Sequence, residues 1–127
     1  MKIVIVDDDI FVSGALTTIL EASGKVTVAA SGTDGKEAAE LYKIHQPDVL
    51  LMDIRMKEKS GLDASAEILE EFPDAKILLL TTFSDDEYIV KALKLGAKGY
   101  LLKQDYASIL PPLEAVCSGQ TVFRTEI

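Results

Sequence analysis

Short apolar runs recur five times along the chain. Their length and their content of Val, Ile and Leu predict buried strands, without the polar alternation of a sheet that has one wet face. The predicted strands are Lys2–Val6, Val26–Ala30, Val49–Met52, Lys76–Leu80 and Gly99–Leu102. A segment with helical spacing of apolar residues follows each strand. This alternation predicts an α/β domain: a doubly wound, five-stranded parallel sheet in the order 2-1-3-4-5, covered on both faces by five helices.

The fifth predicted helix contains two consecutive prolines, Pro111 and Pro112. Proline has no amide donor, so it is tolerated in the first turn, where the amides have no acceptor within the helix. With Ser108 as the N-cap, both prolines would lie in that turn, although Leu110 would be pushed away from α geometry. We therefore expect a helix that is short or irregular at its start. A regular helix from residue 105 to residue 117 would contradict this.

Composition and charge narrow the class of protein. The chain has 127 residues, 48% of them hydrophobic and 27% charged, a globular mixture of the size of one domain. Its net charge of −8 disfavours direct binding to the phosphate backbone of DNA. No apolar run approaches the roughly 20 residues of a membrane span. The single cysteine, Cys117, cannot form an internal disulfide, which fits the cytoplasm. We expect one domain over residues 1–118 and the start of a linker or tail over residues 119–127.

Polar residues with chemical potential follow four of the predicted strands. The first strand ends in Asp7-Asp8-Asp9, the third in Asp53, the fourth in Thr81-Thr82 and the fifth in Lys103. In an open parallel sheet, ligands bind outside the carboxyl ends of the strands, at the switch point of the topology. Two carboxylates about 4 Å apart repel by roughly 4 kcal/mol at an effective dielectric near 20, so a cation is expected among them. All-oxygen ligation favours Mg²⁺, for which Mn²⁺ could substitute.

A carboxylate beside a hard cation, a lysine and a hydroxyl suits phosphoryl transfer onto the carboxylate. Asp53 is the expected acceptor, because it stands alone at the tip of the central strand. Lys103 would share the charge of the phosphoryl oxygens, and Thr81 would donate a hydrogen bond to one of them. Asp7 and Asp8 would hold the metal, one directly and the other through water. Each residue alone has a plainer interpretation, as a turn, strand or surface residue, and Asp9 is expected only to cap a helix or to face water.

These residues resemble the receiver domain of two-component response regulators, over nearly the whole chain. The resemblance rests on the acids after the first strand, on 47–53 (PDVLLMD), on Gly61-Leu62, on 80–82 (LTT) and on 96–103 (GAKGYLLK). The last of these motifs resembles the NarL/FixJ/LuxR-like subfamily, which carries a C-terminal helix-turn-helix. The implied fold is flavodoxin-like, of the CheY type.

The resemblance implies a signalling domain and not a metabolic enzyme. A sensor histidine kinase would pass a phosphoryl group to Asp53 in a Mg²⁺-dependent reaction. The domain itself would catalyse only this transfer and its own dephosphorylation. The resemblance assigns metal ligation, switching and phosphoryl lifetime to further residues. The implied metal ligands are Asp8, Asp53 and the main-chain carbonyl of Arg55, with Asp7 assisting. The implied switch residues are Thr81 and Tyr100, whose ring would turn inward. The implied lifetime-tuning residues are Arg55 and Phe83.

The same resemblance implies an output. Phosphorylation would remodel the face formed by the fourth helix, fifth strand and fifth helix, and would control transcription through a DNA-binding domain outside this chain, with a homodimer on phosphorylation as a further expectation. No membrane is involved, and the expected location is the cytoplasm. Two features depart from the family: Lys57 stands where it usually has proline, and Pro111-Pro112 falls in a helix often used for dimerisation.

Three other functions fit these residues less well. A phosphohydrolase with an aspartyl nucleophile would need a second acid at position 55, where Arg55 cannot act as an acid or base. A flavin mononucleotide carrier would need a hydroxyl- and glycine-rich loop after the first strand, where three acids repel phosphate. A receiver-shaped module that is never phosphorylated is the third, and the presence of all the key residues weighs against it.

Overall fold

The computed structural model describes residues 1–82 and 86–123, apart from the side chain of Asp86. Its strands are β1 (Lys2–Val6), β2 (Thr27–Gly32), β3 (Val49–Asp53), β4 (Ile77–Thr81), β5 (Gly99–Leu102) and β6 (Val122–Phe123). Its helices are α1 (Ile10–Ala22), α2 (Gly35–His45), α3 (Gly61–Glu71), α4 (Asp86–Leu95), the 3₁₀ helix η1 (Lys103–Ser108) and α5 (Leu110–Cys117). None of the helices in the described part of the chain has the length and apolar character to cross a bilayer.

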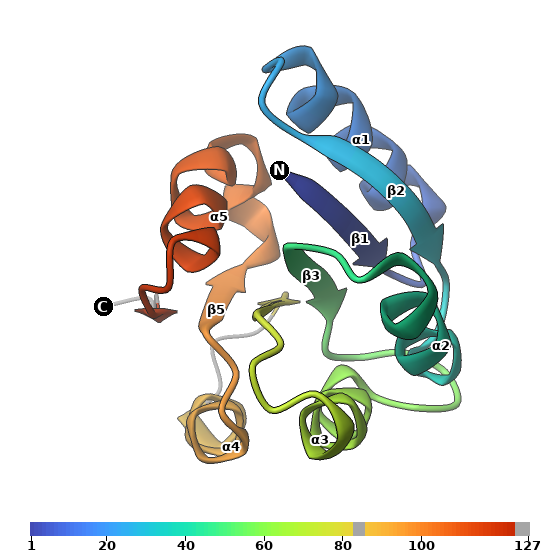
Figure 1. The fold of residues 1–127 in the computed structure, drawn as a ribbon, viewed down its shortest axis with the longest axis vertical. Coiled ribbons are helices and arrows are strands. Elements are labelled where there is room, and N and C mark those ends of the chain that lie inside the picture. The colour runs from blue at the N-terminus through green and yellow to red at the C-terminus, as the bar shows by residue number, and fades with distance from the viewer. Residues whose placement is uncertain (83–85, 124–127) are drawn as a thin grey trace.

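The sheet confirms the predicted topology and extends it by one strand. Its order is β2-β1-β3-β4-β5-β6, and every neighbouring pair is parallel. The expected count of five strands was wrong by one, because Val122 and Phe123 pair with Gly99 and Tyr100 in the segment assigned to the tail. The doubly wound arrangement predicted from the alternation of strands and helices is otherwise the one observed (Figure 1).

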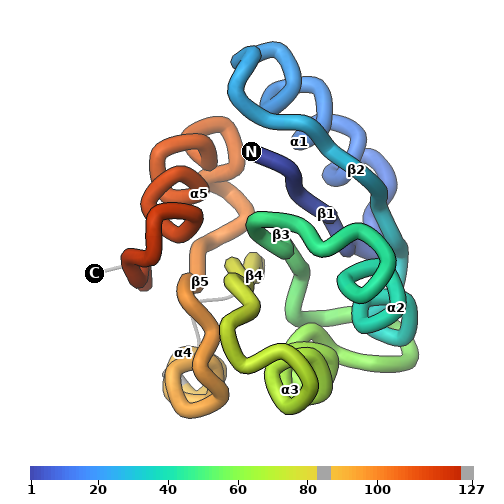
Figure 2. Tube along the Cα trace, in the orientation of Figure 1, coloured from blue at the N-terminus to red at the C-terminus, as the bar shows by residue number. Residues whose placement is uncertain are grey.

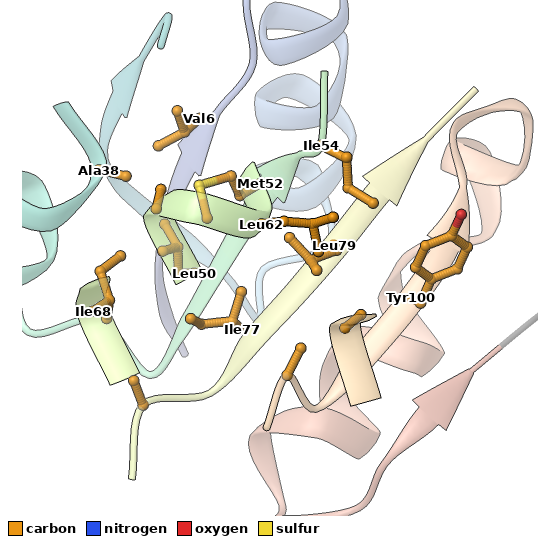
Figure 3. Packing of buried hydrophobic residues seen from close by; sticks show 14 of the residues in the cluster. Val6, Ala38, Leu50, Met52, Ile54, Leu62, Ile68, Ile77, Leu79 and Tyr100 are labelled. Carbon is orange, nitrogen blue, oxygen red and sulfur yellow. The ribbon is translucent and has the colours of Figure 1, made fainter. Parts of the chain in front are cut away.

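Helices cover both faces of the sheet (Figure 2). The buried strand residues accordingly fall into two separate apolar layers. On β1, Ile3 and Ile5 pack with α1 and α5, whereas Val4 and Val6 pack with α2, α3 and α4. The layer on the side of α3 contains Met52, whose neighbours in Figure 3 come from several strands and helices. Burial of each large apolar side chain contributes about 1.5–3 kcal/mol, which explains why these strands are apolar without alternation.

The start of α5 is irregular, as Pro111 and Pro112 predict. The chain forms η1 and then an eight-residue α5, in which the prolines occupy the first turn. The expectation that Ser108 caps this helix was wrong: the cap position is Ile109, whose side chain is buried and which provides no capping hydrogen bond. Burial of Ile109 in the layer on the side of α1 therefore sets where the helix begins.

Candidate functional site

The carboxyl ends of β1, β3 and β5 bring three of the predicted groups into contact. Asp7 follows β1, Asp53 is the last residue of β3, and Lys103 follows β5. The ammonium Nζ of Lys103 donates hydrogen bonds to Asp7 Oδ1 at 3.0 Å and to Asp53 Oδ2 at 3.1 Å. Its distance from Asp7 Oδ2 is 2.9 Å. One ammonium group thus bridges two carboxylates that are nearly inaccessible to solvent, since Asp7 is 1% and Asp53 4% exposed.

Three carboxylates gather at this end of the sheet. Asp7, Asp8 and Asp53 each offer an oxygen, and these oxygens lie within 4.8 Å of one another. Opposite ligands of one Mg²⁺ are about 4.2 Å apart, because each Mg–O distance is about 2.1 Å. The spacing of these oxygens is therefore close to the span of a single ion. Oxygen donors of this charge fit Mg²⁺ better than they fit softer metals.

One oxygen of the Asp7 carboxylate, Oδ2, also favours a cation at this site. Its Oδ1 accepts the main-chain N–H of Asp9 at 2.9 Å as well as the Lys103 hydrogen bond. Its Oδ2 is buried and accepts no hydrogen bond from the residues that the structure describes, although the Lys103 ammonium lies near it in poorer geometry. The ammonium offsets part of the cost of burying this oxygen, and a metal ion or its water would offset the rest.

Burial perturbs all three titratable groups of this cluster. Desolvation, followed by the charge of Asp7, raises the pKa of Asp53 to about 6, and Lys103 only partly opposes this. Desolvation also raises the pKa of Asp7, against the hydrogen bonds from Asp9 and Lys103. Burial alone would lower the pKa of Lys103, but its hydrogen bond to Asp7 and the charge of Asp53 outweigh burial and raise that pKa. When ionised, the three carboxylates carry two more negative charges than the single Lys103 ammonium neutralises.

The site opens into a pocket of about 500 Å³. It is lined by Asp8, Asp9, Ile10, Phe11, Asp53, Arg55, Thr82 and Lys103. Ile10 and Phe11, which are 65% and 84% exposed, were not expected in this pocket from the sequence. Their position immediately after the acids, in the first turn of α1, was the available signal. Asp9 caps α1 as expected, because its side chain accepts the N–H groups of Phe11 and Val12.

The predicted switch residues lie on β4 and β5. Thr81 is the last residue of β4 and is 1% exposed, next to the exposed Thr82 that lines the pocket. Its register partner is Leu102, so it lies at the level of the residue before Lys103. Tyr100 is completely buried, on β5 at the margin of the aliphatic cluster (Figure 3). Its ring is therefore inaccessible to solvent in this structure.

The loop after Asp53 carries Arg55, and a close approach fixes its far end. A Cβ at Gly61 would lie 2.1 Å from the main-chain oxygen of Asp53, so only glycine lets α3 begin so near Asp53. The Arg55 guanidinium reaches toward α4, where it donates to Tyr88 Oη at 3.5 Å and lies 5.8 Å from the ring centroid. Phe83, the second predicted lifetime residue, lies outside the described residues.

Comparisons with known proteins agree with this fold. Residues 3–110 match the family model described as response regulator receiver domain. The chain is 42% identical over 127 residues to the oxygen regulatory protein NreC of Staphylococcus epidermidis, covering 99% of this chain and 56% of that protein. It is 37% identical to the transcriptional regulatory protein DegU of Brevibacillus brevis, covering 94% of this chain and 51% of that one.

A solved structure shows the same arrangement. The LuxR-family two-component response regulator of Aurantimonas sp. SI85-9A1 superposes with a TM-score of 0.90 at 30% identity, covering 95% of this chain and 87% of that chain. By contrast, the chain spans only about half the length of NreC and DegU, the curated relatives that it matches. With a family match over most of its length, it belongs to the response regulator receiver domain family, in the NarL/FixJ/LuxR-like branch.

Proposed function

We propose that this receiver domain takes a phosphoryl group onto Asp53 from a phosphohistidine of a sensor kinase, in a Mg²⁺-dependent reaction. The observation that carries the proposal is the cluster of Asp7, Asp8 and Asp53, with Lys103 Nζ 3.1 Å from the acceptor. Asp8, Asp53 and the main-chain carbonyl of Arg55 would hold the ion, with Asp7 directly or through water. The bound ion, Mg²⁺ or Mn²⁺, would spread the negative charge of the phosphoryl oxygens.

The transfer exchanges one bond to phosphorus for another. A carboxylate oxygen of Asp53 forms the new P–O bond while the P–N bond of the phosphohistidine breaks, and the electron pair remains on the imidazole nitrogen. Lys103 stabilises the charge of the transferring group, and the Thr81 hydroxyl donates to one of its oxygens. In dephosphorylation, water attacks phosphorus, releases inorganic phosphate and restores the carboxylate. Arg55 and Phe83 would set how readily water reaches the acyl phosphate.

Phosphorylation would switch the domain through new charge-assisted hydrogen bonds. Movement of Thr81 toward the phosphoryl group would change the space beside β5 and reposition α4. Because the Tyr100 ring is already buried in this structure, the change at α4 and Thr81 would be larger than the rotation of that ring. The affected surface is the face of α4, β5 and α5, on which a homodimer of the phosphorylated domain would form.

The output would be transcription. DegU is named as a transcriptional regulator, and the chain covers about half of such relatives. The domain would act as the receiver, and residues 119–127, in which β6 pairs with β5, would lead toward a DNA-binding domain. The acidic receiver would not bind DNA itself, since its net charge is −8. The kinase and the domain would meet in the cytoplasm.

Intact mass after incubation with acetyl phosphate and Mg²⁺ tests the proposal. The wild type should gain one phosphoryl group, and chelation of Mg²⁺ should prevent the gain. Asp53→Asn should not react. Asp48→Asn is the matched control, because this exposed acid stands at the other end of β3, and it should react like the wild type. Equal phosphorylation of the Asp53→Asn variant would overturn the proposal.

A further inference from the structure

Asp34 joins two elements that meet beside the acidic pocket. It is the N-cap of α2, and its Oδ1 accepts the N–H of Lys36 at 3.0 Å. The same carboxylate reaches across to the loop between β3 and α3. Its Oδ2 accepts the N–H of Glu58 at 2.9 Å, and its Oδ1 accepts the N–H of Lys59 at 3.1 Å. One side chain thus binds three main-chain amides from segments more than 20 residues apart.

The two segments are also in direct main-chain contact. Gly35 donates its N–H to the carbonyl oxygen of Lys59 at 3.2 Å. A Cβ at Gly35 would lie 2.3 Å from that oxygen, so glycine is needed for the approach. A further ion pair, Lys36 to Glu58 at 3.3 Å, spans the same contact on the exposed side. The end of the loop therefore cannot shift without disturbing the start of α2.

The charge of Asp34 strengthens the hydrogen bonds by which its carboxylate anchors the loop to the start of α2. Hydrogen bonds from the amides of Glu58 and Lys36 lower the pKa of Asp34, so its carboxyl is ionised at neutral pH. Hydrogen bonds that an ionised acceptor receives are about twice as strong as neutral ones. The position at the start of α2 adds a favourable interaction with the helix dipole.

The anchored loop leads directly from the phosphoryl acceptor. Its beginning is fixed by the N–H of Ile54, which donates to the Leu80 carbonyl at 2.9 Å, and its end is held by Asp34. Between these points lies Arg55, which lines the pocket with Asp8 and Asp53. Lys57 stands in the same stretch, so no proline ring restricts the backbone there, and the anchor must supply the restriction.

We propose that Asp34 is a positioning residue of the metal site: through the amides of Glu58 and Lys59 it holds the loop so that the main-chain carbonyl of Arg55 stays within reach of the ion. This role rests on the proposed function. Residues that orient the ligands of a metal change its affinity by about 10–100-fold when they are replaced, although they do not touch the metal.

Calorimetric titration of the metal-free full chain with Mg²⁺ tests the role, at a temperature where every variant is folded. Asp34→Ala should raise the Kd for Mg²⁺ by about 10-fold or more. Asp34→Asn loses the charge but keeps one acceptor oxygen, so its Kd should fall between those of the wild type and Asp34→Ala. In hydrogen exchange, the amides of Glu58 and Lys59 should exchange faster in Asp34→Ala than in the wild type.

Asp48→Ala is the matched control. It also removes a carboxylate that accepts a main-chain amide, that of Lys2 at 2.7 Å, but at the opposite end of the sheet. Its Kd for Mg²⁺ should stay within about 2-fold of the wild type, because it is remote from the ligands. Equal loss of affinity in Asp34→Ala and Asp48→Ala would overturn the role, since general destabilisation would then explain it. Loss of affinity in Asp34→Ala without faster exchange at Glu58 and Lys59 would also overturn it, since removal of a nearby charge, and not release of the loop, would then explain the loss.

The two proposals fail in different ways. Wild type that neither binds Mg²⁺ nor becomes phosphorylated would overturn the proposed function and the positioning role with it. Wild type that binds Mg²⁺ normally, together with an Asp34→Ala variant of unchanged Kd and faster exchange at Glu58 and Lys59, would overturn the positioning role alone.

Discussion

Replacing Asp53, the proposed acceptor, by asparagine should stabilise the metal-free domain. The fold raises the pKa of Asp53 from 3.8 to about 6, mainly by desolvation and next by the charge of Asp7. Between these two pH values the folded state binds more protons than the unfolded state, so stability falls as pH rises. Asparagine has the same shape but no charge, and Lys103 Nζ can still donate to its oxygen.

The magnitude follows from the size of the shift. A raised pKa of about 2 units corresponds to about 3 kcal/mol, at about 1.4 kcal/mol per unit. In chelator at about pH 7.5, Asp53→Asn should therefore be about 3 kcal/mol more stable than the wild type. The difference should shrink to about half at about pH 5 and nearly vanish below about pH 4, where the wild-type carboxyl is protonated in both states.

Urea denaturation in chelator, followed by far-ultraviolet circular dichroism, measures this difference across the pH range. Adding Mg²⁺ at about 100 times its Kd should stabilise the wild type by about 2.7 kcal/mol and the variant much less. Asp105→Asn, which removes an exposed carboxyl, should change stability by no more than about 0.5 kcal/mol. An Asp53→Asn variant that is no more stable than the wild type at about pH 7.5, or whose advantage persists in acid, would refute the reasoning about an uncompensated buried charge.

Four further substitutions test individual positions. Gly61→Ala should lose about 1–3 kcal/mol of stability in urea denaturation and react slowly with acetyl phosphate, because its Cβ would lie 2.1 Å from the Asp53 oxygen. Gly14→Ala has no atom within 4 Å of its Cβ and should instead gain about 0.5–1 kcal/mol. Asp9→Ala should cost about 1 kcal/mol in the same assay through loss of the α1 cap, yet still be phosphorylated; loss of phosphorylation would show that this acid does more than cap. Lys103→Met should raise the pKa of Asp53 above its value of about 6 in carbon NMR of metal-free protein, and an unchanged pKa would contradict the ion pair.

The core of the site could be predicted from the sequence because it depends on strand ends. Once the apolar runs are read as parallel strands, Asp7, Asp53 and Lys103 must lie at the same end of the sheet. The distances between their side chains confirm this. The contacts of Asp34 were not predictable in the same way. The position of Asp34 before a helical segment is typical of a helix cap. Its hydrogen bonds from Glu58 and Lys59, however, join residues 24 and 25 positions apart and depend on how two loops pack.

Tertiary contacts also determine the two features that were predicted wrongly, the start of α5 and the number of strands. The prolines of α5 predicted an irregular start but not its position, which follows from burial of Ile109. Val122 and Phe123 form a strand of two residues, too short to show any periodicity in the sequence. Gly99 on β5 favours this pairing, since a Cβ there would lie only 3.0 Å from the Val122 oxygen.

The sixth strand has a consequence for how the domain behaves as a fragment. The outer margin of β5 would otherwise present unpaired amide and carbonyl groups, the kind of template on which separate molecules add strands and aggregate. Val122 occupies part of it by donating its N–H to the Lys98 carbonyl at 2.9 Å, and Phe123 packs over the apolar layer beside it. A fragment cut at Ser118 would uncover this margin, whereas one that ends after Phe123 keeps it closed and should stay monomeric at higher concentration.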